Sequence, residues 1–137
     1  MKRSPQLAPL SRDHHVALEH ALRLRRASEE DIGAVVAHFL AFLLGPGRSH
    51  FALEETLLAP EVPEAQADLA RRMVDEHVEI LRRAAALGQD PCVVEARELG
   101  ELLTRHVRFE ERQVFPLLEA HLSGDRIREI GRSLARA

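Results

Sequence analysis

Apolar residues recur every three or four positions along most of the chain, which is the spacing of amphipathic α-helices. No stretch shows the strict alternation of a half-buried β-strand. Because the connections between the helical stretches are short, consecutive helices should run antiparallel. We therefore predict an all-α fold, an antiparallel up-down-up-down four-helix bundle in a single domain over residues 1–137. The long helices should span about residues 9–27, 28–60, 63–88 and 90–121, followed by a short C-terminal helix over 126–137.

Capping residues and helix breakers set the expected ends of these helices. Ser11 and Ser28 suit N-cap positions because their hydroxyl groups can accept hydrogen bonds from free backbone amides. The Gly-Pro-Gly segment at residues 45–47 should kink or break the second helix. Pro116 should bend the fourth helix, and residues 123–125 should separate it from the terminal helix.

The composition is that of an ordinary soluble domain, and it restricts the partners. Hydrophobic residues make up 45% of the chain and charged residues 30%, with a formal net charge of −3. Acidic and basic residues are interleaved, so no basic stripe faces phosphates and no nucleic-acid partner is expected. No apolar run is expected to span a membrane, and the basic N-terminus lacks the apolar core of a signal peptide. Cys92 is the only cysteine, which excludes an internal disulfide and favours a cytoplasmic location.

One polar signature of eleven residues occurs twice. HFALEETLLAP (residues 50–60) and HVRFEERQVFP (residues 106–116) both begin with His, carry Glu-Glu at the fifth and sixth places and end in Pro. Residues four apart lie on one face of a helix, so each repeat presents one imidazole beside one carboxylate. The second acid of each pair, Glu55 or Glu111, lies about 100° further round the helix and should face a rim.

The helix faces that carry these pairs are otherwise rich in leucine, so the pairs should point into the core. A buried carboxylate is costly unless it is paired, hydrogen-bonded or bound to a metal. The other two long helices each add a histidine preceded by an acid, Asp13-His14 and Glu76-His77. The apolar stripe of the first helix lies on the side of His14, so we expect His14 to face inward and His15 to lie at the rim.

Each long helix therefore contributes one inward histidine, and two of them add a glutamate. A bundle core is a known place for metal sites built from facing helices. Four imidazoles and two carboxylates suit two divalent first-row ions, because the carboxylates can bridge the ions and the imidazoles can cap them. Six ligands over two ions also leave positions for a small external molecule. The predicted ligands are His14, His50, Glu54, His77, His106 and Glu110.

This pattern of His, His-x-x-x-Glu, His and His-x-x-x-Glu resembles the hemerythrin-like (HHE cation-binding) domains over about residues 8–121. The two eleven-residue signatures resemble those of the family's second and fourth helices. The resemblance implies two iron ions (Fe2+/Fe3+) in a non-haem centre, bridged by the two carboxylates and an oxo or hydroxo group. It implies a small diatomic ligand or peroxide as partner. Oxygen-carrying hemerythrins have a second histidine on the third helix, where this chain has Met73 and Leu81. The pattern is therefore closer to bacterial domains linked to nitric oxide response and iron-centre repair.

Three functions fit this ligand set. The first is a diiron sensor, store or scavenger for dioxygen, nitric oxide, peroxide or iron. The second is a diiron enzyme that reduces peroxide or nitric oxide, and the third is a structural or interaction bundle stabilised by metal. The chain has no Tyr and no Trp to relay radicals, which favours binding or sensing. Zinc or manganese would also suit these ligands, because affinity alone does not select iron.

The remaining polar residues near the repeats have simpler interpretations. Glu55 and Glu111 should be solvated or should orient a ligand from outside. Asp13 and Glu76, each directly before a predicted ligand, could accept a proton from a neighbouring group, but they are interpreted as ordinary helix-surface charges. Helix-surface positions are also expected for His20, His38 and His121.

Overall fold

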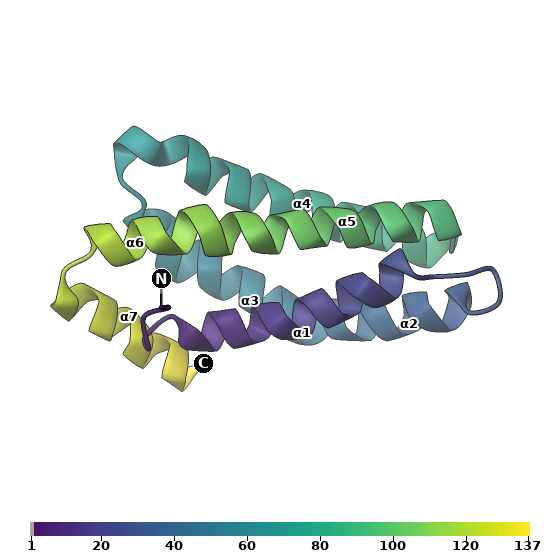
Figure 1. Ribbon diagram of the computed structural model, residues 1–137, viewed down its shortest axis with the longest axis horizontal. Coiled ribbons are helices and arrows are strands. Elements are labelled where there is room, and N and C mark those ends of the chain that lie inside the picture. Colours follow the sequence, from purple (N-terminus) through teal and green to yellow (C-terminus); the bar gives the residue numbers. More distant parts are fainter. Residues whose placement is uncertain (1) are drawn as a thin grey trace.

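Helices account for nearly all of the structure, a computed structural model that describes residues 2–137 (Figure 1). No β-strand occurs within these residues, so the predicted all-α class is confirmed. The α-helices are α1 (Ala8–Arg25), α2 (Ile32–Phe42), α3 (Arg48–Leu53), α4 (Ala67–Gln89), α5 (Val93–Phe109), α6 (Phe115–His121) and α7 (Gly124–Arg136). Three π-helical segments continue the helical course between them: η1 (Leu43–Gly47), η2 (Glu54–Leu58) and η5 (Glu110–Val114). The short 3₁₀ turns η3 (Ala59–Glu61) and η4 (Glu64–Gln66) lead into α4.

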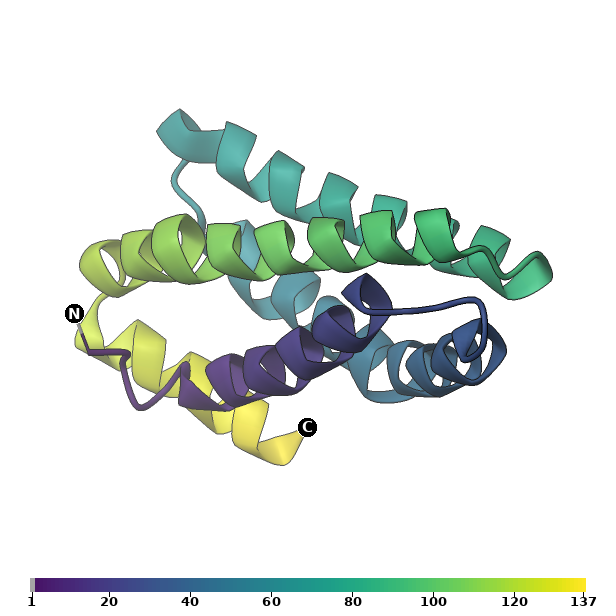
Figure 2. The same cartoon turned by 45° about the vertical axis from the view of Figure 1, so that its right-hand side comes forward.

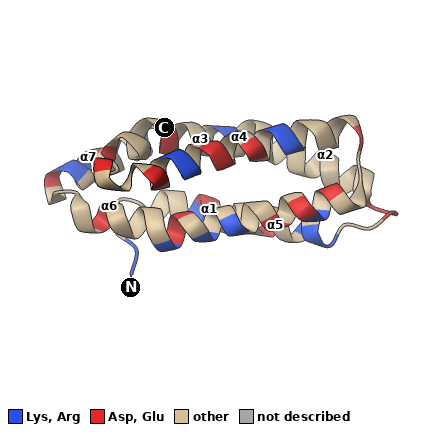
Figure 3. Cartoon of the chain, turned by 90° about the horizontal axis from the view of Figure 1, so that it is seen from above, with Lys and Arg blue, Asp and Glu red and all other residues tan. Residues whose placement is uncertain are grey.

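The helices form a bundle whose long axis is horizontal in Figure 1. The stretches α1, α2 to α3, α4, and α5 to α6 lie along this axis, and α7 folds back beside the start of α1 (Figures 1 and 2). The closest association is between α1 and α5, and α4 packs on α5 as well. Acidic and basic residues are interleaved along the helices (Figure 3), as the sequence predicts.

The apolar core consists of two clusters with a polar layer between them. On α1, Leu10 belongs to one cluster and Ala17 to the other, with His14 between them. On α4, His77 lies between the two clusters in the same way. The terminal helix α7 closes the first of these clusters with Ile130, which is 1% exposed. Histidine and glutamate thus lie in the middle of the bundle, where water has little access.

The Gly-Pro-Gly segment continues the helical course from α2 to α3, so a break there is wrong. It forms the second half of η1, in which the amide of Arg48 donates to the carbonyl oxygen of Leu43, five residues earlier. This wider turn accommodates Pro46, which has no amide hydrogen to donate. Pro116 lies in the first turn of α6, directly after η5, where the missing amide hydrogen costs little.

Two of the predicted helix caps are also wrong. Ser11 lies inside α1, and its hydroxyl donates to the carboxylate of Glu111 at 2.7 Å. Helix α2 begins after Asp31, whose carboxylate accepts a hydrogen bond from the amide of Ser28 at 2.7 Å. The predicted separation before the terminal helix is confirmed, because Ser123 caps α7 and accepts from the amide three residues further on.

The helical stretch Ile32–Glu61 is 30 residues long and, by length and composition alone, apolar enough to cross a membrane. This differs from the prediction that the chain has no apolar run long enough to span a membrane. The most apolar 18 residues of this stretch are 22% buried, and the stretch also carries His50 and Glu54 into the polar layer. Core helices of water-soluble proteins meet the same criterion, so one stretch of this kind is weak support for a membrane span.

Candidate metal centre

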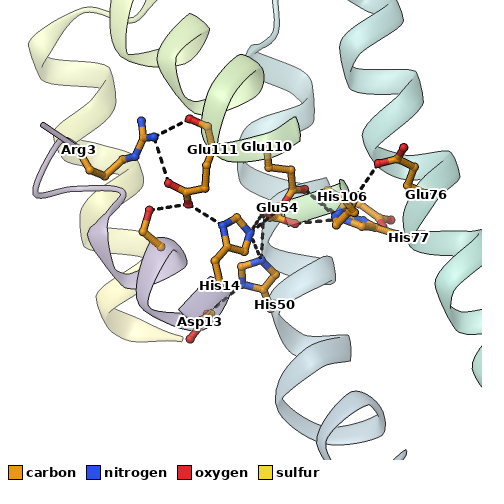
Figure 4. A network of polar contacts seen from close by, with 12 residues as sticks. Arg3, Asp13, His14, His50, Glu54, Glu76, His77, His106, Glu110 and Glu111 are labelled. Atoms are coloured by element: carbon orange, nitrogen blue, oxygen red, sulfur yellow. Dashed lines mark hydrogen bonds and ion pairs between the residues drawn. The ribbon is translucent and has the colours of Figure 1, made fainter. Parts of the chain in front are cut away.

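Six polar side chains fill the layer between the two apolar clusters (Figure 4). They are the six residues that the sequence singles out, and none is more than 6% exposed. The donors come from α1, α3, η2, α4, α5 and η5, so every long helical stretch contributes. The layer consists of His14, His50, Glu54, His77, His106 and Glu110.

The possible ligand atoms form two overlapping groups, and within each group they all lie within 4.8 Å of one another. Glu54 and Glu110 belong to both groups. Nε2 of His14 lies 2.8 Å from Oε1 of Glu110, and Nε2 of His77 lies 3.0 Å from Oε1 of Glu54. Two histidines per group with two shared carboxylates suit a pair of ions with bridging carboxylates. The histidines are His14 and His50 in the first group, and His77 and His106 in the second.

Several inward-facing atoms of the layer have no hydrogen-bond partner. Both carboxylate oxygens of Glu54 and the Nε2 atom of His106 are buried in this way. One Glu54 oxygen lies 3.1 Å from Nε2 of His50, but the two atoms do not have hydrogen-bond geometry. An unpaired buried polar atom costs about 1–3 kcal/mol. A divalent cation would use the free lone pairs of these oxygen and nitrogen atoms, so the donor set fits a metal.

Each of the four histidines also has a carboxylate at Nδ1, the ring nitrogen on the outer side of the layer (Figure 4). Such a carboxylate fixes the tautomer and orientation of a metal-binding imidazole and raises its basicity. The four distances are 2.6 Å for Glu111 to His14, 2.9 Å for Asp13 to His50, 2.7 Å for Glu55 to His77 and 2.8 Å for Glu76 to His106.

The interpretation of Asp13 and Glu76 as ordinary surface charges is therefore wrong. Both acids contact a histidine on a neighbouring helix, and Glu76 is held in turn by Arg72 at 3.1 Å. Glu55 and Glu111 do contact histidines, as one of their two interpretations expected. The sequence does mark Asp13 and Glu76, since each directly precedes an inward histidine. Which histidine each acid contacts depends on the distance between helices, which the sequence pattern does not give.

The doubled glutamates of each repeat hold opposite edges of one imidazole on another helix. Glu110 lies 2.8 Å from Nε2 of His14, while Glu111 lies 2.6 Å from Nδ1 of the same ring. Glu54 and Glu55 likewise lie at opposite edges of the His77 ring, at 3.0 and 2.7 Å, although the Glu54 contact does not have hydrogen-bond geometry. Both pairs begin a π-helical segment, whose larger number of residues per turn reduces the angle between consecutive side chains. The second acid therefore reaches the partner helix instead of facing only a rim.

In the absence of a metal ion, these carboxylates favour protonated histidines. Burial by itself lowers the pKa of His14, but the nearby carboxylates of Glu110, Glu111 and Glu54 outweigh burial and raise this pKa to about 11. The same balance raises the pKa of His77 to about 10 and that of His50 to about 9. A metal ion bound to Nε2 would take the place of a proton there, so metal binding and proton release are linked.

The histidines outside the layer differ from one another. His15 is exposed, whereas its neighbour His14 is 3% exposed and faces the layer. His38 and His121 are exposed, as the sequence predicts. His20 departs from that prediction, because its ring stacks on the ring of Phe42 at 4.1 Å and its Nδ1 atom is buried without a partner.

A cavity of about 260 Å³ lies against the histidine side of the layer. His14, His50 and His106 line it, and the other lining residues are mainly apolar side chains of α1, α2, η1, α3 and α5. The bridging candidates Glu54 and Glu110 are not among its lining residues. The cavity is therefore separate from the space between the two carboxylates.

Comparison with known proteins gives one match. A family model described as the hemerythrin HHE cation binding domain matches residues 7–118. The matched segment runs from the start of α1 into α6 and contains all six residues of the polar layer. Neither the curated proteins nor the solved structures contain a match to the chain.

Proposed function

Because the chain belongs to the hemerythrin HHE cation-binding family, we propose that its polar layer binds two divalent first-row ions, with iron as the native metal. The observation that carries the proposal is the pair of overlapping donor groups with unpartnered lone pairs directed inward. Bound iron would supply Lewis acidity and redox chemistry toward a small molecule. The proposed ligands are His14, His50, Glu54, His77, His106 and Glu110.

The chain's own residues prepare the layer for this role. The four outer carboxylates hold Nδ1 of each imidazole, so Nε2 is the atom left to face an ion. The apolar clusters on both sides keep bulk water from competing for the ligands. We infer that the four long stretches run up, down, up and down in an antiparallel bundle, which presents one histidine from each stretch to a common centre.

The proposed partner is a small oxidant or gas, namely dioxygen, nitric oxide or peroxide, and the proposed role is to bind or sense it or to handle iron. Six ligands for two ions leave coordination positions for such a molecule. Binding is favoured over enzymatic reduction because the chain contains no Tyr and no Trp. We propose that the protein is cytoplasmic, because its single cysteine, Cys92, cannot form an internal disulfide and therefore suits a reducing compartment.

Metal analysis after anaerobic loading with ferrous iron tests the proposal. The unmodified chain should take up two irons, one for each donor group, and its absorption spectrum should change when air or nitric oxide is admitted. His14→Ala should lower the iron content, and Glu54→Gln should lower it further because Glu54 belongs to both groups. His15→Ala is the matched control, since His15 is exposed and adjacent to His14.

Equal iron content in the His14→Ala and His15→Ala variants would overturn the ligand assignment. An iron content of zero or one per unmodified chain, with no spectral change, would overturn the dinuclear site itself. Catalytic turnover of peroxide or nitric oxide with an added reductant would favour the enzyme over the sensor. Two bound ions with no spectral response to either gas would favour a metal that only stabilises the bundle.

A further inference from the structure

The cavity beside the polar layer is larger than a diatomic gas requires. Its volume is about 260 Å³, whereas a dry apolar cavity of about 150 Å³ is enough to bind benzene. A molecule of two atoms would leave most of this space unfilled, and unfilled space forfeits dispersion contacts. The size therefore points to an organic occupant.

The walls of the cavity offer carbon rather than hydrogen-bonding groups. Phe42, Phe51, Leu103 and Val107 all line it. The histidines in the wall have their Nδ1 atoms bound to carboxylates, while their Nε2 atoms face the layer. What they present to the cavity is therefore mainly ring carbon. An occupant that needed several hydrogen bonds would lose its bonds to water without replacement.

The η1 segment forms part of the cavity wall. Leu43, Pro46 and Gly47 of this segment all line the cavity. A Cβ atom added to Gly47 would lie 3.1 Å from Leu43 Cδ1 and 3.6 Å from the ring of Phe42. The glycine therefore lets this wall pack closely without a further side chain. The π-helical turn thus forms an apolar part of the cavity wall.

The charge at the cavity argues against an anionic occupant. Asp13 is the one charged non-histidine side chain in the lining. It is 55% exposed, and its carboxylate already contacts Nδ1 of His50. Val16, which is 45% exposed, and the exposed Pro46 also line the cavity, so its solvent-accessible residues lie on α1 and η1. No Lys or Arg is among the lining residues. A carboxylate or phosphate would meet the negative charge of Asp13, and the histidines in the wall, when protonated, are already paired with carboxylates of the protein.

We propose that this cavity binds an uncharged, apolar organic molecule of benzene size or somewhat larger, next to the histidines of the polar layer. Its position beside bound metal rests on the proposed function, but the cavity and its affinity for an apolar molecule do not. The occupant would lie in van der Waals contact with Phe42, Leu103 and Val107.

Methyl NMR with benzene as the probe tests this inference. Benzene is titrated into the metal-free chain and into the zinc-loaded chain, because zinc is diamagnetic. We expect saturable shifts of the Val16, Leu103 and Val107 methyl groups, with a dissociation constant of about 1 mM. Intermolecular nuclear Overhauser effects to the same methyl groups locate the probe without any variant. The methyl groups of Leu134 lie in the other apolar cluster and should not shift.

A variant that fills the cavity provides the second test. Ala17 lines the cavity, so Ala17→Leu should weaken benzene binding by at least about tenfold. Ala37→Leu is the matched control, because Ala37 is an exposed helical position outside the cavity and should leave binding unchanged. Circular dichroism verifies that both variants are folded. If Ala17→Leu does not fold, the Overhauser effects in the unmodified chain decide.

The possible outcomes separate this inference from the proposed function. Shifts that are not saturable, or Overhauser effects confined to other methyl groups, would overturn the cavity inference even if two irons bind. Equal affinity of the two leucine variants would overturn it as well. Benzene binding in a chain that takes up no iron would support the cavity and overturn the metal proposal.

Discussion

Every histidine of the polar layer is held at Nδ1 by a residue from a different helical element. Asp13 on α1 reaches His50 on α3 at 2.9 Å, for example. An imidazole fixed in this way loses little further freedom when Nε2 binds an ion, which favours binding. Arg3 extends this support, because it donates to the backbone oxygen of Glu111 at 2.7 Å and to its carboxylate at 3.1 Å. Arg3 lies before the segment that the family model matches.

At the residue scale, His20 should titrate below an ordinary histidine. Burial lowers its pKa from 6.5, and the positive charges of His38 and Arg23 lower it further, while Glu19 opposes them. The unfolded chain then binds this proton more readily than the folded chain. The free energy of unfolding should therefore fall as the pH drops through about 6.5 and below. NMR titration of the His20 ring measures the pKa directly.

Two variants separate the causes of this shift. Arg23→Gln should raise the His20 pKa by removing a positive charge, and His20→Gln should flatten the fall of stability on the acidic side. A His20 pKa at or above 6.5 in the unmodified chain would contradict the prediction.

At the scale of elements, the π-helical segments explain why two acids stand side by side in each repeat. In η2 the amide of Ala59 donates to the carbonyl oxygen of Glu54, five residues earlier. In η5 the amide of Phe115 donates to that of Glu110 in the same way. π-Helical turns inside α-helices are frequent at functional sites, and here η2 and η5 each direct two consecutive acids to one histidine.

Deleting Thr56 should weaken metal binding without unfolding the helix. The deletion removes one residue between Glu54 and Ala59, so their bond becomes the four-residue bond of an α-helix. Glu55 would then turn away from His77, and metal affinity should fall by roughly 10–100-fold. Thr56→Ala keeps the chain length and is the control. Calorimetric titration with zinc measures both, and equal affinities would show that the π-helical turn has no part in the site.

Helix positions and the inward residues could be predicted from sequence, because apolar periodicity reports which face of a helix is buried. His14 against His15 is an example, since the rest of the apolar stripe lies on the side of His14. The π-helical turns could not be predicted, because tertiary packing decides between four-residue and five-residue hydrogen bonds. The roles of Asp13 and Glu76 depend in the same way on helix spacing, which periodicity does not report.

At the scale of the whole molecule, the bundle depends on a close approach of α1 and α5 at Gly100. A Cβ atom added there would lie 2.7 Å from the backbone oxygen of Ala21 and 2.7 Å from Cγ of Arg25. Gly100→Ala should therefore force the helices apart and lower the free energy of unfolding by roughly 1–3 kcal/mol.

Gly33→Ala is the matched control for this prediction. Nothing lies within 4 Å of a Cβ atom at Gly33, near the start of α2. Alanine restricts the unfolded chain, so this variant should raise the free energy of unfolding by roughly 0.4–1 kcal/mol. Urea denaturation measures both variants, and an unchanged stability of Gly100→Ala would show that α1 and α5 do not need this close approach.

The polar layer also determines the order in which the chain can fold. His14 and Glu110 are 96 residues apart, so their meeting closes one of the longest loops in the molecule. Contacts within helices form sooner because they cost less loop-closure entropy, and the layer should therefore be completed near the end of folding. An ion that binds only the completed layer would leave the folding rate almost unchanged and would slow unfolding. Bound metal would then set the lifetime of the folded chain rather than the speed of its formation, which stopped-flow rates with and without zinc would measure.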